Sequence, residues 1–337
     1  MPDKSEILLQ TEHLDVHFPL KKETPFAARK FVQAVSDVSL TIHRGEIFGL
    51  VGESGCGKST FADTTLGILR PTGGNVLFDG EALDRQNKAR FKQQRRRMQK
   101  IFQDPASSLN PRFTVQDAIA EPLRIRGGFT AAQQTEMTVD MLRKVGLSEH
   151  DRTRNVTEFS GGQQQRIAIA RALILKPDYL VCDEPVSALD VSVHAQILNL
   201  LTDLRAQTQV TYLFISHNLA VVQKFCDRMA ILYLGKVVEF GSAARIFQNP
   251  LHPYTQALFS AIPIPDPTVR MNRIVLEGSI PSPANPPQGC KFHTRCRCCM
   301  EKCKHETPVQ REIEPGHYVV CHLYDEEVSA DEAAQNV

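Results

Sequence analysis

The sequence predicts a mixed α/β domain over its first 245 residues, followed by a small Cys- and Pro-rich domain. The apolar runs YLVCD (179–183) and TYLFIS (211–216) end in polar residues, which is typical of strands buried on both faces of a parallel sheet. The pattern is helical between residues 113 and 175. Beyond residue 246 prolines and cysteines become dense and regular periodicity fades, which indicates a domain boundary.

Two hairpins are expected in the first domain. VSLTIHRGEIFGLVG (38–52) should turn at His43–Gly45, and RMAILYLGKVVEFG (228–241) at Gly235–Lys236. We place a helical subdomain at about residues 104–175 and end the second domain at residue 324. The last thirteen residues, 325–337, are polar and acidic and predict a disordered tail.

Composition excludes several classes of protein. With 42% apolar and 23% charged residues, the 337-residue chain is ordinary for a globular protein. A formal net charge of +1 gives no global reason to expect nucleic acid or an anionic membrane as partner. We find no apolar run near the roughly 18 residues of a spanning helix, and no uninterrupted apolar core of a signal peptide. We therefore expect a cytosolic chain, in which clustered cysteines favour metal binding over disulfides.

The stretch GLVGESGCGKST (49–60) is a complete P-loop between an apolar strand and a helix. Its glycines let backbone N–H groups close around phosphate oxygens, Lys58 adds a charge, and the Ser59 hydroxyl can bind Mg²⁺. A glycine-rich turn that merely carries a lysine is disfavoured by the flanking strand and helix. The candidate nucleotide-binding residues are Gly52, Glu53, Ser54, Gly55, Cys56, Gly57, Lys58, Ser59 and Thr60.

Asp183 and Glu184 follow a predicted buried strand. A carboxylate there can reach the Mg²⁺ shell, and its neighbour can orient and deprotonate a water molecule. Acidic residues at strand ends are common in α/β loops, so this pair indicates a nucleotide site only in combination with the P-loop.

The segment EFSGGQQQRIAIARALI (158–174) begins like a helix. Ser160 and Gln163 fit a capping box. A cap alone leaves the two glycines at 161 and 162 unexplained, because glycine weakens a helix. They suit a close approach of backbone N–H groups to a phosphate at the positive helix end.

FSGGQ (159–163) resembles the signature motif of ATP-binding cassette (ABC) proteins, usually written LSGGQ, with Phe159 in place of leucine. Further motifs of that family follow the expected order: Gln103 matches the Q-loop, SALD (187–190) the D-loop, and His217 the switch histidine. The resemblance covers about residues 7–245. It implies a RecA-like P-loop core with an antiparallel β part and a helical subdomain. Phe31 is the nearest candidate for the aromatic residue that stacks on adenine.

The resemblance also implies a mechanism. Two cassettes would dimerise head to tail, with each ATP between the P-loop of one chain and the signature segment of the other. Glu184 would be the catalytic base, and His217 would contact the γ-phosphate. The remaining residues implied for nucleotide contact are Gln103, Ser160, Gly161, Gly162, Gln163 and Asp190, with Ser59, Gln103 and Asp183 at Mg²⁺.

Two stretches resemble the ATPases of bacterial oligopeptide, dipeptide and nickel importers: FQDPASSLNPR (102–112) and NPLHPYTQALFSAIP (249–263). Within the second, His252-Pro253 should begin a helix. The resemblance implies a peripheral subunit at the cytoplasmic face of the membrane. Its partners would be a second, paralogous ATPase, two transmembrane permease subunits and a periplasmic or extracellular substrate-binding protein. Import of a nickel chelate stays open as an alternative to di- or oligopeptides.

A soluble ABC ATPase acting on nucleic acid is the competing class. Arg95, Arg96, Arg97 and Lys100 could form a basic footprint. The near-zero net charge and the few aromatic residues favour a solvated helix face instead, so we expect no nucleic-acid partner.

Six of the nine cysteines lie in the C-terminal domain: Cys290, Cys296, Cys298, Cys299, Cys303 and Cys321. Cys296-x2-Cys299 has zinc-knuckle spacing, and the whole set does not match ferredoxin spacings. The importer resemblance implies a [4Fe–4S] cluster on Cys290, Cys296, Cys303 and Cys321; zinc and free thiols stay open. We expect five nearby basic residues to lower the thiol pKa values: Lys291, Arg295, Arg297, Lys302 and Lys304. The isolated cysteines, Cys56, Cys182 and Cys226, are expected to be buried fillers.

Overall fold

The computed structural model describes residues 6–21, 29–187, 189–262 and 273–325. The chain divides into two compact units: unit 1 comprises residues 1–10, 41–47 and 77–216, and unit 2 comprises residues 11–40, 48–76 and 217–337. Both are discontinuous in sequence, and the boundary near residue 245 stays a prediction. All of the predicted acidic tail except Asp325 lies outside the described residues.

Unit 1 contains the parallel strands that the two apolar runs predict. β6 (Met98–Ile101), β7 (Tyr179–Asp183) and β8 (Thr211–Ile215) pair in parallel in this order. Every residue of β7 and β8 is buried, which confirms strands covered on both faces. The Tyr212 hydroxyl of β8 donates to the Leu201 carbonyl of α7 (Val191–Thr208), at 3.0 Å. β5 (Glu81–Ala82) pairs with the end of β4 (Gly73–Phe78).

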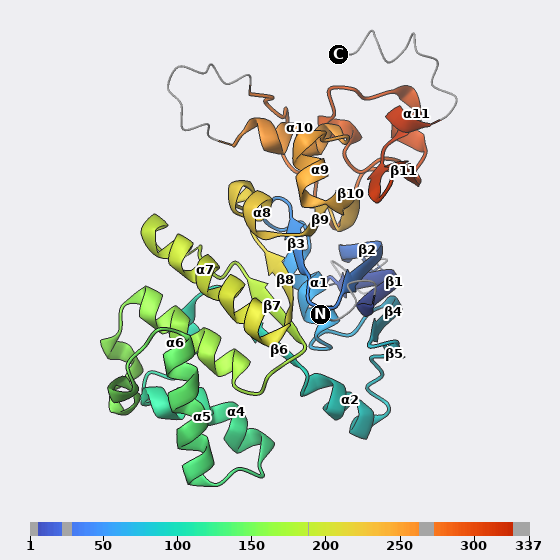
Figure 1. The fold of residues 1–337 in the computed structure, drawn as a ribbon. Helices are drawn as coiled ribbons and strands as arrows, with labels where there is room; N and C mark the ends of the chain where they lie inside the picture. The colour runs from blue at the N-terminus through green and yellow to red at the C-terminus, as the bar shows by residue number, and fades with distance from the viewer. Residues whose placement is uncertain (1–5, 22–28, 188, 263–272, 326–337) are drawn as a thin grey trace, which may run out of the picture. The chain divides into compact units, whose positions relative to one another are not determined.

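The helices of unit 1 lie mainly between β6 and β7 in the sequence. α4, α5 and α6 pack together (Figure 1). Capping boxes begin α4 and α5, at Thr114 and Thr130, so the first N–H groups of both helices are satisfied locally. The helical elements here are α2 (Lys88–Arg95), α3 (Pro105–Ser108), α4 (Val115–Arg126), α5 (Ala131–Lys144), the 3₁₀ turns Glu149–Thr153 and Val156–Glu158, and α6 (Gly161–Leu173).

Five neighbouring strands of unit 2 follow the order β11-β12-β10-β9-β3. β3 and β9 are parallel, and the other neighbours are antiparallel. These strands are β3 (Ile47–Val51), β9 (Arg228–Tyr233), β10 (Lys236–Ser242), β11 (Gln310–Glu314) and β12 (His317–Val320). The helices are α1 (Lys58–Thr65), α8 (Leu219–Phe225), α9 (Ala243–Gln248), α10 (Pro253–Ser260) and α11 (Glu301–His305), with 3₁₀ turns at His293–Arg295 and His322–Tyr324.

One predicted hairpin is confirmed and the other is wrong. β9 and β10 form the second hairpin, and Lys236 pairs with Tyr233, so the turn lies at Leu234–Gly235, one residue before its predicted place. The first pairing is absent: β2 (Phe31–His43) lies beside β1 (Ile7–Pro19), whereas β3 pairs with β9. An alternating strand, a turn and an apolar strand read the same in sequence whether or not the two strands share a sheet.

Residues 273–325 contain regular structure that their sequence does not indicate. β12 pairs with β10, matching Val319 to Glu239, and the Phe240 and Tyr318 rings stack at 4.5 Å. Leu251, Val319 and Cys321 form a small buried cluster. β11 and β12 form an antiparallel hairpin that sequence periodicity missed, because most residues of β11 are exposed and the strand shows no alternation of buried and exposed positions. The predicted start of α10 is confirmed, with His252 as N-cap and Pro253 at the first helical position.

Candidate functional site

The P-loop of unit 2 joins β3 to α1. Gly57 has a φ of 108°, and a Cβ there would lie 2.0 Å from the Ala34 carbonyl oxygen, so only glycine fits. The buried Lys58 ammonium donates to the carbonyl of Gly52 at 2.7 Å and to that of Glu53 at 2.9 Å. Lys58 is therefore held across its own loop, where a point charge can meet phosphate oxygens.

Cys56, Cys182 and Cys226 are buried, which confirms the prediction that they are small fillers. Burial raises the pKa of the Cys56 thiol, although the neighbouring Lys58 acts in the opposite direction. The thiol inside the P-loop is therefore protonated near neutral pH and a poor nucleophile.

In unit 1, Asp183 and Glu184 stand at the end of β7. Lys100 on β6 forms an ion pair with Asp183 at 2.9 Å, and both side chains are only about a tenth exposed (10% and 12%). The amide of Gln103 donates to Glu184 Oε2, also at 2.9 Å. Two residues predicted from separate motifs thus meet, and Gln103 orients the candidate base.

The backbone of Glu184 is unusual. Its φ is +47°, in the left-handed region that non-glycine residues rarely adopt, while its N–H donates to the Ile215 carbonyl at 3.0 Å. Such strain persists where the surrounding structure enforces a particular side-chain position, and it is concentrated at functional sites. This supports an active role for the Glu184 carboxylate.

The capping box at the start of α6 is confirmed. Gln163 Oε1 accepts from the Ser160 N–H at 3.0 Å, and Ser160 Oγ accepts from the Gln163 N–H at 3.4 Å. Ser160, Gly161 and Gln163 are exposed. A Cβ at Gly162 would lie 2.6 Å from Val193 Cγ1, so packing against α7 gives a second reason for this glycine.

The remaining candidate residues, Asp190, His217 and Phe31, belong to different units. Asp190 caps α7, and its carboxylate accepts from Ser192 Oγ at 2.6 Å and from the Val193 N–H at 2.9 Å; these hydrogen bonds lower the pKa of Asp190. His217 begins the last segment of unit 2, two residues after the end of β8 and one residue before the cap of α8. Phe31 is the first residue of β2, with 43% of its surface exposed, and its adenine contact stays a prediction.

The basic run does not form a solvated helix face. α2 ends at Arg95, whereas Arg97 forms ion pairs with Asp79 (2.7 Å) and Asp178. Lys100 lies on β6 and pairs with Asp183. Two of the four cations are therefore engaged by carboxylates of the same unit, which weakens any role as a nucleic-acid footprint.

The expectation that basic neighbours lower the thiol pKa values is wrong. Burial raises the pKa of Cys290 to about 11 and that of Cys296 to about 12, and it also raises the pKa values of Cys299 and Cys321. The nearby cations are turned to other partners. Lys304 and Arg295 bond to carboxylates, Lys302 to Asp325, Arg297 to the Gln256 amide, and Lys291 to a backbone carbonyl.

The cysteines test whether a metal would fit. Cys303 and Cys321 are buried, and Cys290 and Cys296 are partly buried. After burial, the remaining influences that raise the pKa of Cys321 are the thiols of Cys290, Cys296 and Cys303. The four predicted ligands thus influence one another electrostatically. Within the described ranges, however, no group of three or more His, Cys, Asp or Glu side chains has an arrangement that could hold a metal ion. The thiols are suitable metal ligands, but their side chains are not arranged as a metal site.

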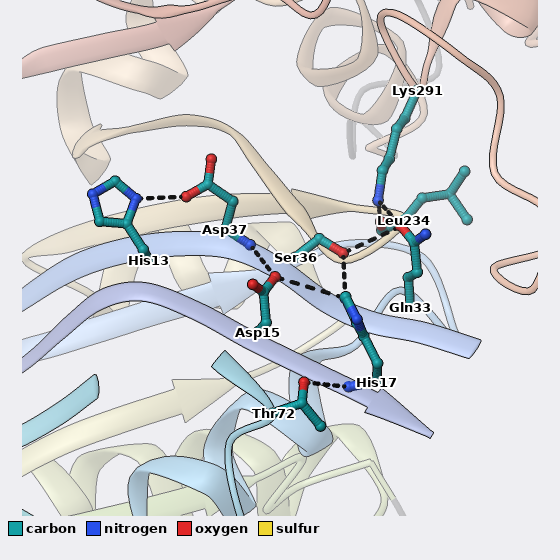
Figure 2. Close-up of polar contacts among 9 residues, drawn as sticks. All are labelled: His13, Asp15, His17, Gln33, Ser36, Asp37, Thr72, Leu234 and Lys291. Atoms are coloured by element: carbon teal, nitrogen blue, oxygen red, sulfur yellow. Dashed lines mark hydrogen bonds and ion pairs between the residues drawn. The ribbon is translucent and has the colours of Figure 1, made fainter. Parts of the chain in front are cut away.

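Contacts within unit 2 fix the start of residues 289–306, which we call the cysteine segment. Lys291 donates to the Leu234 carbonyl at 3.0 Å and to Gln33 Oε1 at 3.4 Å (Figure 2). The Gln33 N–H donates to the Pro283 carbonyl at 2.9 Å. Burial lowers the pKa of Lys291 to about 8. The segment is therefore anchored to β2 and to the β9–β10 turn.

Comparison with known proteins identifies the family. The model of the ABC transporter family matches residues 35–187, and that of the oligopeptide/dipeptide transporter C-terminal region matches residues 238–303. A putative peptide import ATP-binding protein of Brucella ovis is 48% identical over 314 residues, 93% of this chain and 97% of that protein. The chain belongs to the ATP-binding proteins of peptide ABC importers. The oligopeptide transport ATP-binding protein AppF of Bacillus subtilis is 44% identical over 95% of this chain and 98% of its own length.

Solved structures confirm the ABC ATPase fold. The chain resembles cbiO1 from Clostridium perfringens, part of the ABC transporter complex cbiONQ, with a TM-score of 0.63 and 26% identity over 72% of this chain and 92% of that one. It also resembles the ATP-binding cassette MJ0796, in a dimeric post-hydrolysis state bound to ADP and Pi, with a TM-score of 0.62 and 27% identity over 70% and 99% of the two chains. None of the helices in the described residues is long and apolar enough to cross a membrane.

Proposed function

We propose that the P-loop, the β7 acids and the signature segment of this chain form an ATPase site that acts at the interface of a cassette dimer. As a member of its family, the chain is an ATP hydrolase that powers peptide import. The observation that supports the proposed site most directly is the Gln103–Glu184 hydrogen bond, at 2.9 Å, beside the strained Glu184 backbone.

We assign each candidate residue one role in this site. Lys58 is held at the P-loop to neutralise phosphate charge, with backbone N–H groups of residues 52–60 around the phosphates. Ser59 and Asp183 would hold Mg²⁺, which supplies positive charge against the γ-phosphate when bound. Glu184, oriented by Gln103, would take a proton from the attacking water.

The exposed start of α6 supports the dimer. Gly161 is exposed at the first position of α6, and its N–H group lies outside the capping box, where the γ-phosphate of an ATP bound to a partner chain could be held. His217 would contact the γ-phosphate of the ATP at this chain's own P-loop, and Asp190 would lie at the dimer contact. We propose a paralogous ATPase as the second cassette. Two permease subunits and a substrate-binding protein would complete an importer whose ATPases lie at the cytoplasmic face.

Binding and turnover of MgATP by the full chain test the site. Lys58→Ala should lose MgATP binding, whereas Glu184→Gln should bind MgATP and lose phosphate release. Lys92→Ala is a matched control, because Lys92 is an exposed lysine on α2 that belongs to none of the motifs. Normal binding by Lys58→Ala, or normal turnover by Glu184→Gln, would contradict the assignment.

We also propose that Cys290, Cys296, Cys303 and Cys321 hold a [4Fe–4S] cluster, with zinc as the alternative. The proposal is supported by the grouping of six cysteines within residues 290–321 and by the electrostatic influence of Cys290, Cys296 and Cys303 on Cys321. A cluster would serve as a structural crosslink between the cysteine segment and the end of β12. Binding requires local rearrangement and loss of the thiol protons, because the described side chains do not assemble a ligand group.

Metal analysis of the anaerobically purified chain separates the alternatives. About four irons with matching acid-labile sulfide would support the cluster, and Cys290→Ser should then lose iron and its absorption. Zinc without sulfide would support a zinc site in place of the cluster. A chain that contains neither iron nor zinc would refute the proposal.

A further inference from the structure

The P-loop has a partner far away in the sequence. Arg295 lies next to Cys296 and forms a two-pronged ion pair with Glu53, the residue after the first P-loop glycine: its two terminal nitrogens donate to the carboxylate at 2.8 and 3.3 Å. The Arg295 side chain is only 7% exposed, and that of Glu53 25%. Such paired, partly desolvated bonds are stronger and more directional than an exposed lysine pair.

The same glutamate is held by its backbone as well. Its N–H donates to the Tyr254 hydroxyl of α10 at 3.0 Å, and its carbonyl accepts from the Lys58 ammonium at 2.9 Å. Tyr254 in turn packs edge-on against Tyr233 at 4.8 Å and tilted against Phe292 at 5.3 Å. Arg295 and Tyr254 therefore hold the carboxylate and the N–H of Glu53, while Lys58 bonds to its carbonyl.

We propose that Arg295 is a positioning residue for ATP, which acts through Glu53 on the peptide group that orients Lys58. Because Arg295 belongs to the cysteine segment, that segment contributes to the nucleotide affinity of the P-loop. Lys291 donates to the Leu234 carbonyl and so fixes the backbone near Arg295, which holds the Arg295 side chain in reach of Glu53. This inference depends on the proposed nucleotide site at the P-loop.

Titration of the full chain with MgATP tests the role of Arg295. Loss of a charged, directional hydrogen-bonded pair beside the loop should weaken binding by Arg295→Ala about tenfold. Arg295→Lys keeps the charge without the fork and should lose about threefold. Arg297→Ala is the matched control. Arg297 is exposed and donates to the Gln256 amide oxygen at 3.1 Å, away from Glu53, so this variant should keep its MgATP affinity within about twofold of wild type.

A double-mutant cycle shows whether Arg295 acts through Glu53. Glu53→Ala removes the carboxylate and keeps both backbone bonds, so adding Arg295→Ala to it should change affinity less than about twofold. At saturating ATP, the turnover of Arg295→Lys should equal that of wild type, so the loss lies in KM. A merely structural role would instead lower the thermal midpoint of Arg295→Lys and its turnover together.

Three results would overturn the inference: wild-type affinity in Arg295→Ala, an undiminished loss in the Glu53→Ala background, or a turnover defect in Arg295→Lys at saturating ATP. Wild-type chain that binds no MgATP would instead refute the proposed nucleotide site itself. The two failures are therefore distinguishable.

Discussion

Glu239 is a buried carboxylate on which the C-terminal residues depend. It is 0% exposed, and its two oxygens accept from the Leu251 N–H at 2.9 Å, the His252 N–H at 2.9 Å and His317 Nε2 at 2.8 Å. It thereby joins β10 to the start of α10 and to β12. Glu239→Ala would leave three buried donors without an acceptor and open a cavity.

The magnitude follows from those donors. Each buried donor without a partner costs about 1–3 kcal/mol, so Glu239→Ala should lower the free energy of unfolding by about 3 kcal/mol or more. Glu239→Gln should cost less, about 1–3 kcal/mol, because one amide oxygen still accepts while the NH₂ group faces a donor.

Urea unfolding of the nucleotide-free chain, followed by circular dichroism, measures this loss. Glu314→Ala is the matched control, because Glu314 is an exposed glutamate that accepts from Asn249 at 3.3 Å, and it should change stability by less than about 0.5 kcal/mol. A loss below about 1 kcal/mol in Glu239→Ala would refute the reasoning, since it would mean that water or a shifted side chain satisfies all three donors.

Three further predictions concern catalysis and pH. Glu184→Gln should retain MgATP binding and lose about 10²–10⁴ in phosphate release, because the general base is gone; a loss below tenfold in a phosphate assay would contradict its role. Gln103→Ala should reduce turnover at saturating MgATP by about tenfold, since it removes the 2.9 Å hydrogen bond that orients Glu184; equal kcat values would show that the bond is dispensable. Burial lowers the pKa of His252 to about 4 from its usual 6.5, so the unfolded chain takes up this proton first and stability should fall as the pH drops from 6.5 to 4, by up to about 1.4 kcal/mol per pH unit. His252→Asn can still cap α10 without titrating, and thermal unfolding across this window should show a shallower slope for it; an unchanged slope would assign the pH dependence to other groups.

Local patterns in the sequence were sufficient for the P-loop, the capping box of α6, the buried strands β7 and β8, and the start of α10. Each depends on neighbours a few residues apart: Ser160 with Gln163, His252 with Pro253, Gly57 with Lys58. Such features are governed by hydrogen bonds and backbone dihedrals within one turn or strand, so they are visible in the chain itself.

The tertiary structure alone decided which distant residues meet. β3 pairs with β9 instead of β2, β12 extends the sheet at β10, and Arg295 bonds to Glu53 across 242 positions. It also reversed the predicted thiol acidity, because burial of Cys290 and Cys296 outweighs the charges nearby in sequence. Strand pairing, burial and long-range ion pairs depend on how the chain folds back on itself, and no local pattern encodes them.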